Sequence, residues 1–195
     1  MSSWAALTRR AQLQQGETVL INGATGTSGG LAVRIAKHLG AGKIIATGRN
    51  RDVLDQLRAQ GVDITLTLDE LPGALPALMK EGIDVVLDYL WGQSALDIMQ
   101  AAVAGAEKVV RFVQIGSLSG QEISLHSKLL RSSGLTLMGS GLGSVSDAEL
   151  VACISEMLNA AAESDFSIAF QMRPLSEVAQ AWQEDDSRSR TVFTL

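Results

Sequence analysis

Cysteine, proline and aromatic residues are scarce in this sequence, and the shortages exclude several kinds of protein. Cys153 is the single cysteine, so neither an internal disulfide nor a zinc site made of several cysteines can form. Only 4% of the residues are aromatic, which leaves the core to leucine, isoleucine, valine and alanine. The formal net charge of -5 is opposite in sign to the basic surface that nucleic-acid binding needs. We therefore expect no nucleic-acid partner.

Long hydrophobic runs are also missing. A membrane-spanning helix needs about 18 consecutive apolar residues, and the apolar runs of this chain are far shorter. The first residues, Met1 to Trp4, show neither the basic start nor the apolar stretch of a secretory signal. A chain with one cysteine is also compatible with a reducing compartment. These features predict a cytoplasmic protein with no membrane contact.

Short apolar runs instead alternate with segments of helical periodicity. The runs of strand length are 18–21, 44–47, 64–68, 84–88, 109–115, 135–138 and 191–195. The helical segments are 3–13, 31–39, 50–60, 94–103, 146–162, 175–184 and a weak one, 73–80, interrupted by Pro72 and Pro76. Strands that are apolar throughout are typical of parallel sheets with helices on both faces. The pattern predicts one α/β domain, a doubly wound parallel sheet (Rossmann fold) in three αβα layers.

Glycine is abundant, and its densest group, 23–30, lies between the first predicted strand and the helix after it. A glycine-rich turn in that position lets the backbone approach a pyrophosphate, which the positive end of the helix attracts. Compared with the dinucleotide fingerprint G-x-G-x-x-G, Gly26 would admit the phosphate and Gly29 would let the helix pack against the strand. The context favours cofactor binding over a purely structural turn. The predicted contacts are Ala24, Thr25, Gly26, Thr27, Ser28 and Gly29.

The end of the second predicted strand distinguishes NAD from NADP. An NAD site usually places Asp or Glu there to bind the ribose 2′-hydroxyl. No acidic residue occurs between Glu17 and Asp52, and the strand is followed by Arg49 and Arg51. A guanidinium group binds a phosphate well, whereas an arginine at a helix N-terminus is otherwise slightly unfavourable. The pattern favours NADP(H) over the alternative that both arginines are only solvated.

A family resemblance is carried by five segments: Gly16-Glu-Thr-Val-Leu-Ile21, the loop 23–29, Ile35-Ala-Lys-His-Leu-Gly-Ala41, Ile83-Asp-Val-Val-Leu-Asp88 and Arg111-Phe-Val-Gln-Ile-Gly116. Together they resemble the cofactor-binding domain of the medium-chain dehydrogenase/reductase superfamily. The quinone oxidoreductase-like and zinc-type alcohol dehydrogenase-like members are the most similar. The segment 174–182 also resembles the closing helix of that family.

The resemblance implies a divided enzyme, in which a GroES-like catalytic domain precedes the cofactor domain and the chain returns to it at the C-terminus. We therefore expect residues 1–195 to be the NADP(H)-binding domain, with 1–13 as a hinge-like helix and 170–195 as the return segment. About 120–150 residues of catalytic domain would lie outside this chain. No residue present is assigned as a catalytic acid, base or metal ligand, so we expect this chain alone to be inactive.

The resemblance also implies cofactor contacts and a reaction class. Gly48, Arg49 and Asn50 would hold the adenosine ribose and its 2′-phosphate. The path to the nicotinamide would be lined by Tyr89, Leu90, Ile115, Gly116, Ser117, Gly139, Ser140 and Gly141. Tyr89 could equally be a half-buried packing residue. Members of the family transfer hydride between NADPH and a carbonyl, a quinone or an activated alkene, and the sequence does not choose among these substrates.

Two other functions remain open. The loop also fits the motif of short-chain reductases, but their Tyr-x-x-x-Lys pair is missing because Tyr89, the only tyrosine, is followed by Gln93. An atypical short-chain reductase-like protein or a non-catalytic NADP-binding sensor is therefore the alternative. The third interpretation is an assembly module. Strand 135–138 would form a sheet edge, as in the dimers of the resembling family, and we expect a two-fold homodimer through it.

Four further residues, Cys153, Trp4, Trp91 and Trp182, are interpreted as packing residues. Cys153 lies on a predicted amphipathic helix, where a small buried thiol is expected. Trp4 and Trp182 flank the segments that would touch the catalytic domain, so exposed apolar surface is expected beside them.

Overall fold

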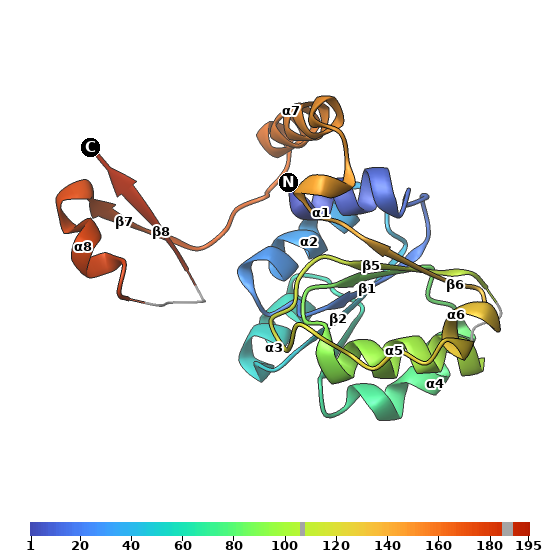
Figure 1. Ribbon diagram of the computed structural model, residues 1–195. Coiled ribbons are helices and arrows are strands. Elements are labelled where there is room, and N and C mark those ends of the chain that lie inside the picture. Colours follow the sequence, from blue (N-terminus) through green and yellow to red (C-terminus); the bar gives the residue numbers. More distant parts are fainter. Residues whose placement is uncertain (106–107, 185–188) are drawn as a thin grey trace.

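Six parallel strands form the central sheet in the order β3-β2-β1-β4-β5-β6 (Figure 1). They are β1 (Thr18–Asn22), β2 (Lys43–Gly48), β3 (Ile64–Thr67), β4 (Val85–Asp88), β5 (Val110–Gln114) and β6 (Leu135–Gly139). The computed structural model describes residues 1–105, 108–184 and 189–195. Strand order reverses between β1 and β4, and this reversal is where doubly wound sheets bind ligands. The predicted Rossmann fold is confirmed.

Helices cover both faces of the sheet and make the three layers (Figure 1). Two hydrophobic clusters form because alternate residues of a strand point to opposite faces: Val19 and Ile21 enter one cluster, and Leu20 the other. The first cluster contains residues of α2 (Thr27–His38), α3 (Arg51–Ala59) and α7 (Asp147–Glu163). The second contains residues of α4 (Leu71–Glu81) and α5 (Gly92–Gly105). Short helices α6 (Lys128–Arg131) and η2 (Leu142–Ser144) flank β6.

The ends of these helices follow local signals in the sequence. The Asn50 side chain accepts a hydrogen bond from the Val53 amide at 3.2 Å and caps α3, as predicted. Gly40 and Gly61 end α2 and α3 with positive φ angles of 89° each. The interruption predicted within 73–80 is wrong, because α4 runs through both prolines. Pro72 lies in the first turn, where its missing N–H has no helical partner to lose.

The N-terminal helix is tied to the main body. The predicted helix 3–13 is shorter, with α1 (Ser2–Ala5) continuing as a π-helical turn, η1 (Ala6–Arg10). Trp4 is buried, and its indole N–H donates to Glu156 of α7 at 3.1 Å. Arg10 donates to the carbonyl of Gly139, the last residue of β6, at 2.9 Å. Cys153 of α7 is fully buried, which confirms its packing role.

The C-terminal segment forms a small unit of its own. Strand β7 (Phe170–Pro174) pairs in parallel with β8 (Arg190–Thr194), and η3 (Leu175–Glu177) and α8 (Val178–Ala181) follow β7. Figure 1 shows this unit apart from the sheet, beyond a long connection after α7. The terminal strand was predicted, but β7 was not, because it lacks the continuous apolar run on which the strand predictions relied. The predicted helix 175–184 is only partly formed.

Apolar side chains are exposed on this C-terminal unit. Trp182 is 77% exposed, so its interpretation as a packing residue is wrong, because no described part of the chain covers it. Phe170 and Met172 of β7 are also exposed. The exposed apolar surface expected near Trp182 is therefore present, whereas the surface at Trp4 is buried.

Within the residues that the structure describes, no helix is both long and apolar enough to cross a bilayer.

Candidate cofactor-binding site

The glycine loop connects β1 to α2 at the point where strand order reverses. Gly23 has a φ of 97°, and the amides of Gly23 and Ala24 donate to the Thr47 carbonyl of β2 at 3.1 and 2.8 Å. Helix α2 begins after Gly26, which offers no side-chain oxygen as a cap, and its first turn carries no acidic residue. The partial positive charge at this end of α2 is therefore available to an anionic ligand.

Two glycines of the loop differ in what requires them. A Cβ atom placed on Gly29 would lie 2.2 Å from the Gly23 carbonyl oxygen and 2.7 Å from the Cα of Ala24. Gly29 is therefore needed for packing between helix and loop, as predicted. A Cβ on Gly26 would meet only the Gly23 carbonyl oxygen, at 3.8 Å. Contacts within the protein thus do not require glycine there, and the missing side chain leaves space for a phosphate.

A cavity of about 690 Å³ opens beside the loop. It brings together many of the predicted contacts, namely Gly26, Thr27, Ser28, Gly29, Tyr89, Ile115, Gly116 and Ser117. Its remaining lining residues are Ser2, Gly23, Leu118, Gln121 and Arg190. Arg190, from β8, is the single cation of this described lining and was not predicted. Only the long-range position of β8 places it near the loop, so no local signal could have found it.

Tyr89 is buried, with only 5% of its surface exposed, although it lines the cavity. Its hydroxyl lies 2.7 Å from the Ser3 hydroxyl of α1. Burial raises the pKa of Tyr89 above its usual value, so the phenol stays protonated. A Cβ on Gly116 would lie 2.7 Å from the Tyr89 carbonyl oxygen, so the backbones that follow β4 and β5 pack closely. Tyr89 is thus both a packing residue and part of the cavity wall.

The structure does not bring all predicted contacts into this cavity. Leu90 packs against Gly23, on which a Cβ would lie 3.0 Å from the leucine side chain. Gly139 lines a separate cavity of about 430 Å³ with Trp91 and Gln114, and Ser117 borders both cavities. Ser140 and Gly141 line a third, mostly apolar cavity of about 160 Å³.

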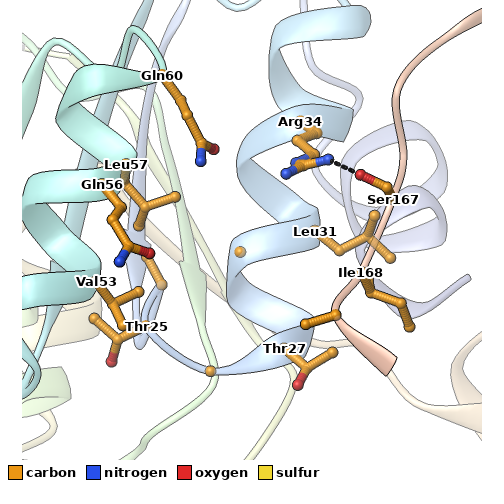
Figure 2. Close-up of a pocket in the computed structure, with 14 residues that line it drawn as sticks. Thr25, Thr27, Leu31, Arg34, Val53, Gln56, Leu57, Gln60, Ser167 and Ile168 are labelled. Carbon is orange, nitrogen blue, oxygen red and sulfur yellow. Dashed lines mark hydrogen bonds between the residues drawn. The ribbon is translucent and has the colours of Figure 1, made fainter. Parts of the chain in front are cut away.

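Ala24 and Thr25 face a groove of about 310 Å³ between α2 and α3 (Figure 2). Gly26 and Thr27 line both this groove and the larger cavity, so the loop lies between the two. At the far side, Arg34 of α2 donates to the Ser167 hydroxyl at 2.6 Å and pairs with Asp165 at 3.1 Å. These contacts attach the connection after α7 to α2.

Comparison with known proteins identifies the family. Residues 29–161 match the sequence pattern of the zinc-binding dehydrogenase family. The chain belongs to this family. With its six-stranded Rossmann sheet it is a cofactor-binding domain of the medium-chain dehydrogenase/reductase superfamily, as the sequence resemblance predicted.

Several relatives of this zinc-binding dehydrogenase domain have described activities. A probable NADPH-dependent quinone reductase of Emericella nidulans is 32% identical over 207 residues, covering 98% of this chain and 58% of the relative. An NAD-dependent alcohol dehydrogenase of Saccharolobus solfataricus is 28% identical, covering 71% and 40%. The solved quinone oxidoreductase of Thermus thermophilus, which has a complex with NADPH, superposes with a TM-score of 0.65 at 25% identity, covering 82% and 48%. These relatives are named as oxidoreductases, and this chain spans between 40% and 58% of their length.

The name of the family implies a zinc ion, which a cluster of His, Cys, Asp or Glu side chains would have to hold. Across the described residues, no three His, Cys, Asp or Glu side chains lie close enough together to hold a metal ion. The residues that the structure describes therefore do not form a zinc site.

One cationic side chain just after β2, that of Arg49, has no polar partner among the described residues. Arg49 is exposed and forms no hydrogen bond or ion pair with any described residue. Arg51 is paired with Glu70, and this pair lowers the pKa of Glu70 to about 2. A Cβ on Gly48 would lie 2.4 Å from the Thr25 side chain, so the end of β2 packs directly against the glycine loop. Of the two arginines predicted to bind phosphate, only Arg49 is available without breaking an ion pair.

A buried polar cluster beneath the loop was not predicted. The carboxylate of Asp88, at the end of β4, accepts from the Asn22 side-chain amide at 2.8 Å. Asn22 also donates to the Ser94 hydroxyl at 2.9 Å and accepts from the Thr47 hydroxyl at 2.8 Å. Burial is the main cause that raises the pKa of Asp88 to about 6, against the opposing effect of its hydrogen bonds. The sequence shows an acidic strand end but not its partners.

Proposed function

We propose that this chain is the NADP(H)-binding domain of an oxidoreductase that transfers hydride between NADPH and a carbonyl, a quinone or an activated alkene. The observation that carries the choice of cofactor is Arg49, an exposed and unpaired guanidinium beside the glycine loop. No carboxylate stands at the end of β2 to bind an unphosphorylated ribose. The NADPH dependence of the Emericella relative supports this choice, and the NAD-dependent relative makes the test necessary.

In this proposal each part of the site has one task. The loop residues 24–29 bind the pyrophosphate, with Arg190 as an additional cation, and Gly48, Arg49 and Asn50 bind the adenosine ribose and its 2′-phosphate. Arg51 reinforces the local positive charge. The backbone of 115–117 together with Tyr89 and Leu90 lines the path of the cofactor, which supplies the hydride when bound. Gly139 and Ser140 would reach the nicotinamide end only if the cofactor extends past Ser117.

Replacing Arg49 by alanine should weaken NADPH binding by about tenfold or more, because a charge-assisted hydrogen bond to phosphate is lost. Binding of NADH should change by less than about twofold, since NADH lacks that phosphate. Arg58→Ala is the matched control, because it removes one exposed arginine from the last turn of α3, the helix that begins shortly after Arg49. Isothermal titration calorimetry measures the affinities of the unmodified chain and of both variants for NADPH and for NADH. Equal losses for both nucleotides, or equal losses in both variants, would contradict the assignment of the phosphate to Arg49.

We also propose that this chain binds the cofactor without turning over a substrate. No catalytic acid, base or metal ligand is assigned in it, and it spans 58% of the Emericella relative. NADPH absorbance at 340 nm should therefore stay constant in the presence of a quinone or an enone. Oxidation of NADPH by this chain would overturn this part of the proposal. The family match disfavours the short-chain reductase alternative, and a non-catalytic NADP-binding sensor remains the second candidate.

A homodimer through the edge strand β6 is part of the same proposal. Strand β6 lies at one edge of the sheet, and its Thr136 is exposed. Light scattering during size-exclusion chromatography should give twice the chain mass over a wide range of concentrations. A monomer throughout that range would exclude the dimer. The cytoplasmic location stays a prediction.

A further inference from the structure

Trp91 adopts a backbone conformation that large side chains avoid. Its φ is 59°, in the left-handed region, and the Gly92 that follows has a φ of 70°. A bulky residue is disfavoured in this region, and it keeps such a conformation only when surrounding contacts hold it there. Residues with strained backbone conformations are common at functional sites, so it matters which group holds Trp91 in this conformation.

That group is the Asp88 carboxylate, which is completely buried. The Trp91 amide donates to both carboxylate oxygens, at 3.1 and 3.2 Å, and the Leu90 amide donates to one of them at 3.2 Å. The Asn22 side-chain amide donates to the same oxygen at 2.8 Å. One carboxylate therefore holds the turn 89–91 and the end of β1 at once.

The glycine loop is attached to the same group of atoms. The Tyr89 amide donates to the Asn22 carbonyl at 3.0 Å, and the Leu90 side chain packs against Gly23. The Thr47 hydroxyl donates to the Asn22 side chain, and the backbone carbonyl of Thr47 accepts from the amides of Gly23 and Ala24. A shift of the turn 89–91 would therefore move both the wall of the cavity and the loop.

We infer that Asp88 is a positioning residue of the cofactor site, which keeps Trp91 in its left-handed conformation and so fixes Tyr89 and Leu90 against the glycine loop. Asp88 itself lies beneath the loop and lines none of the cavities described above. The inference rests on the proposed function, because its readout is cofactor affinity.

A double substitution tests this role. Asp88→Ala should weaken NADPH binding by about tenfold, the size expected when one strained residue relaxes. Adding Trp91→Gly should restore most of that affinity, because glycine adopts the left-handed conformation without the carboxylate. Trp91→Ala is the matched control: it removes the same indole but keeps the Cβ atom that disfavours this conformation. Asp88→Asn, which keeps an oxygen for the three N–H groups, should bind nearly as well as the unmodified chain.

The outcomes separate this inference from the proposed function. If the unmodified chain does not bind NADPH in calorimetry, the proposed function fails, and the role of Asp88 as a positioning residue of a cofactor site fails with it. If it binds, but Trp91→Gly and Trp91→Ala rescue Asp88→Ala equally or not at all, the positioning role is overturned. Circular dichroism checks that each variant is folded. Should Asp88→Ala not fold, Asp88→Ser replaces it, since its short side chain cannot reach Asn22 and Trp91 together, and the same outcomes apply.

Discussion

Replacing Gly29 by alanine is expected to destabilise the domain by about 3 kcal/mol and to weaken NADPH binding strongly. The new Cβ would lie 2.2 Å from the Gly23 carbonyl oxygen, 2.7 Å from the Cα of Ala24 and 2.8 Å from the Gly23 carbonyl carbon. All three atoms are backbone, so no side-chain rotation can relieve the overlap. Helix α2 and the loop must separate, and the loop is the part that would contact the pyrophosphate.

Gly30→Ala is the matched control for this prediction. Gly30 is the next residue of α2, and a Cβ there would lie 3.5 Å from the Ala24 carbonyl oxygen, which is an ordinary contact. Alanine favours the helix over glycine by up to about 1 kcal/mol, so Gly30→Ala should be neutral or stabilising. Urea unfolding followed by circular dichroism measures both free energies. Similar stabilities of the two variants would show that the loop adapts and that Gly29 is not needed for packing.

Replacing Asp88 by asparagine is expected to reduce the dependence of stability on pH between 4.5 and 7.5. The pKa of Asp88 in the folded chain is about 6, raised from 3.8 mainly by burial. Because the folded value is the higher one, folding favours the protonated carboxyl. The resulting stabilisation is fully present below the unfolded pKa and is lost as pH rises through about 6.

The size of this effect follows from the shift. A shift of roughly two units is worth about 3 kcal/mol, of which about 2 kcal/mol is lost between pH 4.5 and 7.5. Asparagine does not titrate, so Asp88→Asn should gain about 2 kcal/mol relative to the unmodified chain over that range. Urea unfolding at several pH values gives the difference. Parallel curves would mean that the hydrogen bonds from Asn22, Leu90 and Trp91 outweigh burial and hold the pKa near its usual value.

Much of the fold could be predicted because its signals are local. The apolar runs gave the six strands of the sheet, and Asn50 and Gly61 marked the ends of α3 by their own hydrogen-bonding and backbone preferences. The glycine loop was recognised because strand, turn and helix are adjacent in the sequence. Strand β7 was missed because its alternating residues carry no apolar run.

The candidate site was predicted only in part, for a related reason. Residues shortly after a strand, such as Tyr89 and Gly116, were expected from the family resemblance, and they line one cavity because parallel strands end at the same edge of the sheet. Arg190 was not found, since it reaches the cavity from a strand more than 160 residues beyond the loop. The pairing of Arg51 with Glu70 likewise depends on the pairing of β2 with β3, because the two residues follow the ends of these strands. It leaves Arg49 as the available cation.

The sequence by itself determined the doubly wound sheet, the glycine loop and the family, because periodicity, turn chemistry and the order of motifs are properties of neighbouring residues. Only the tertiary structure decided which arginine after β2 is held in an ion pair and which can bind an anion. It also decided that a buried carboxylate holds Trp91 in a strained turn beneath the loop, because Asp88 and Asn22 are 66 residues apart and meet only when β1 and β4 pair.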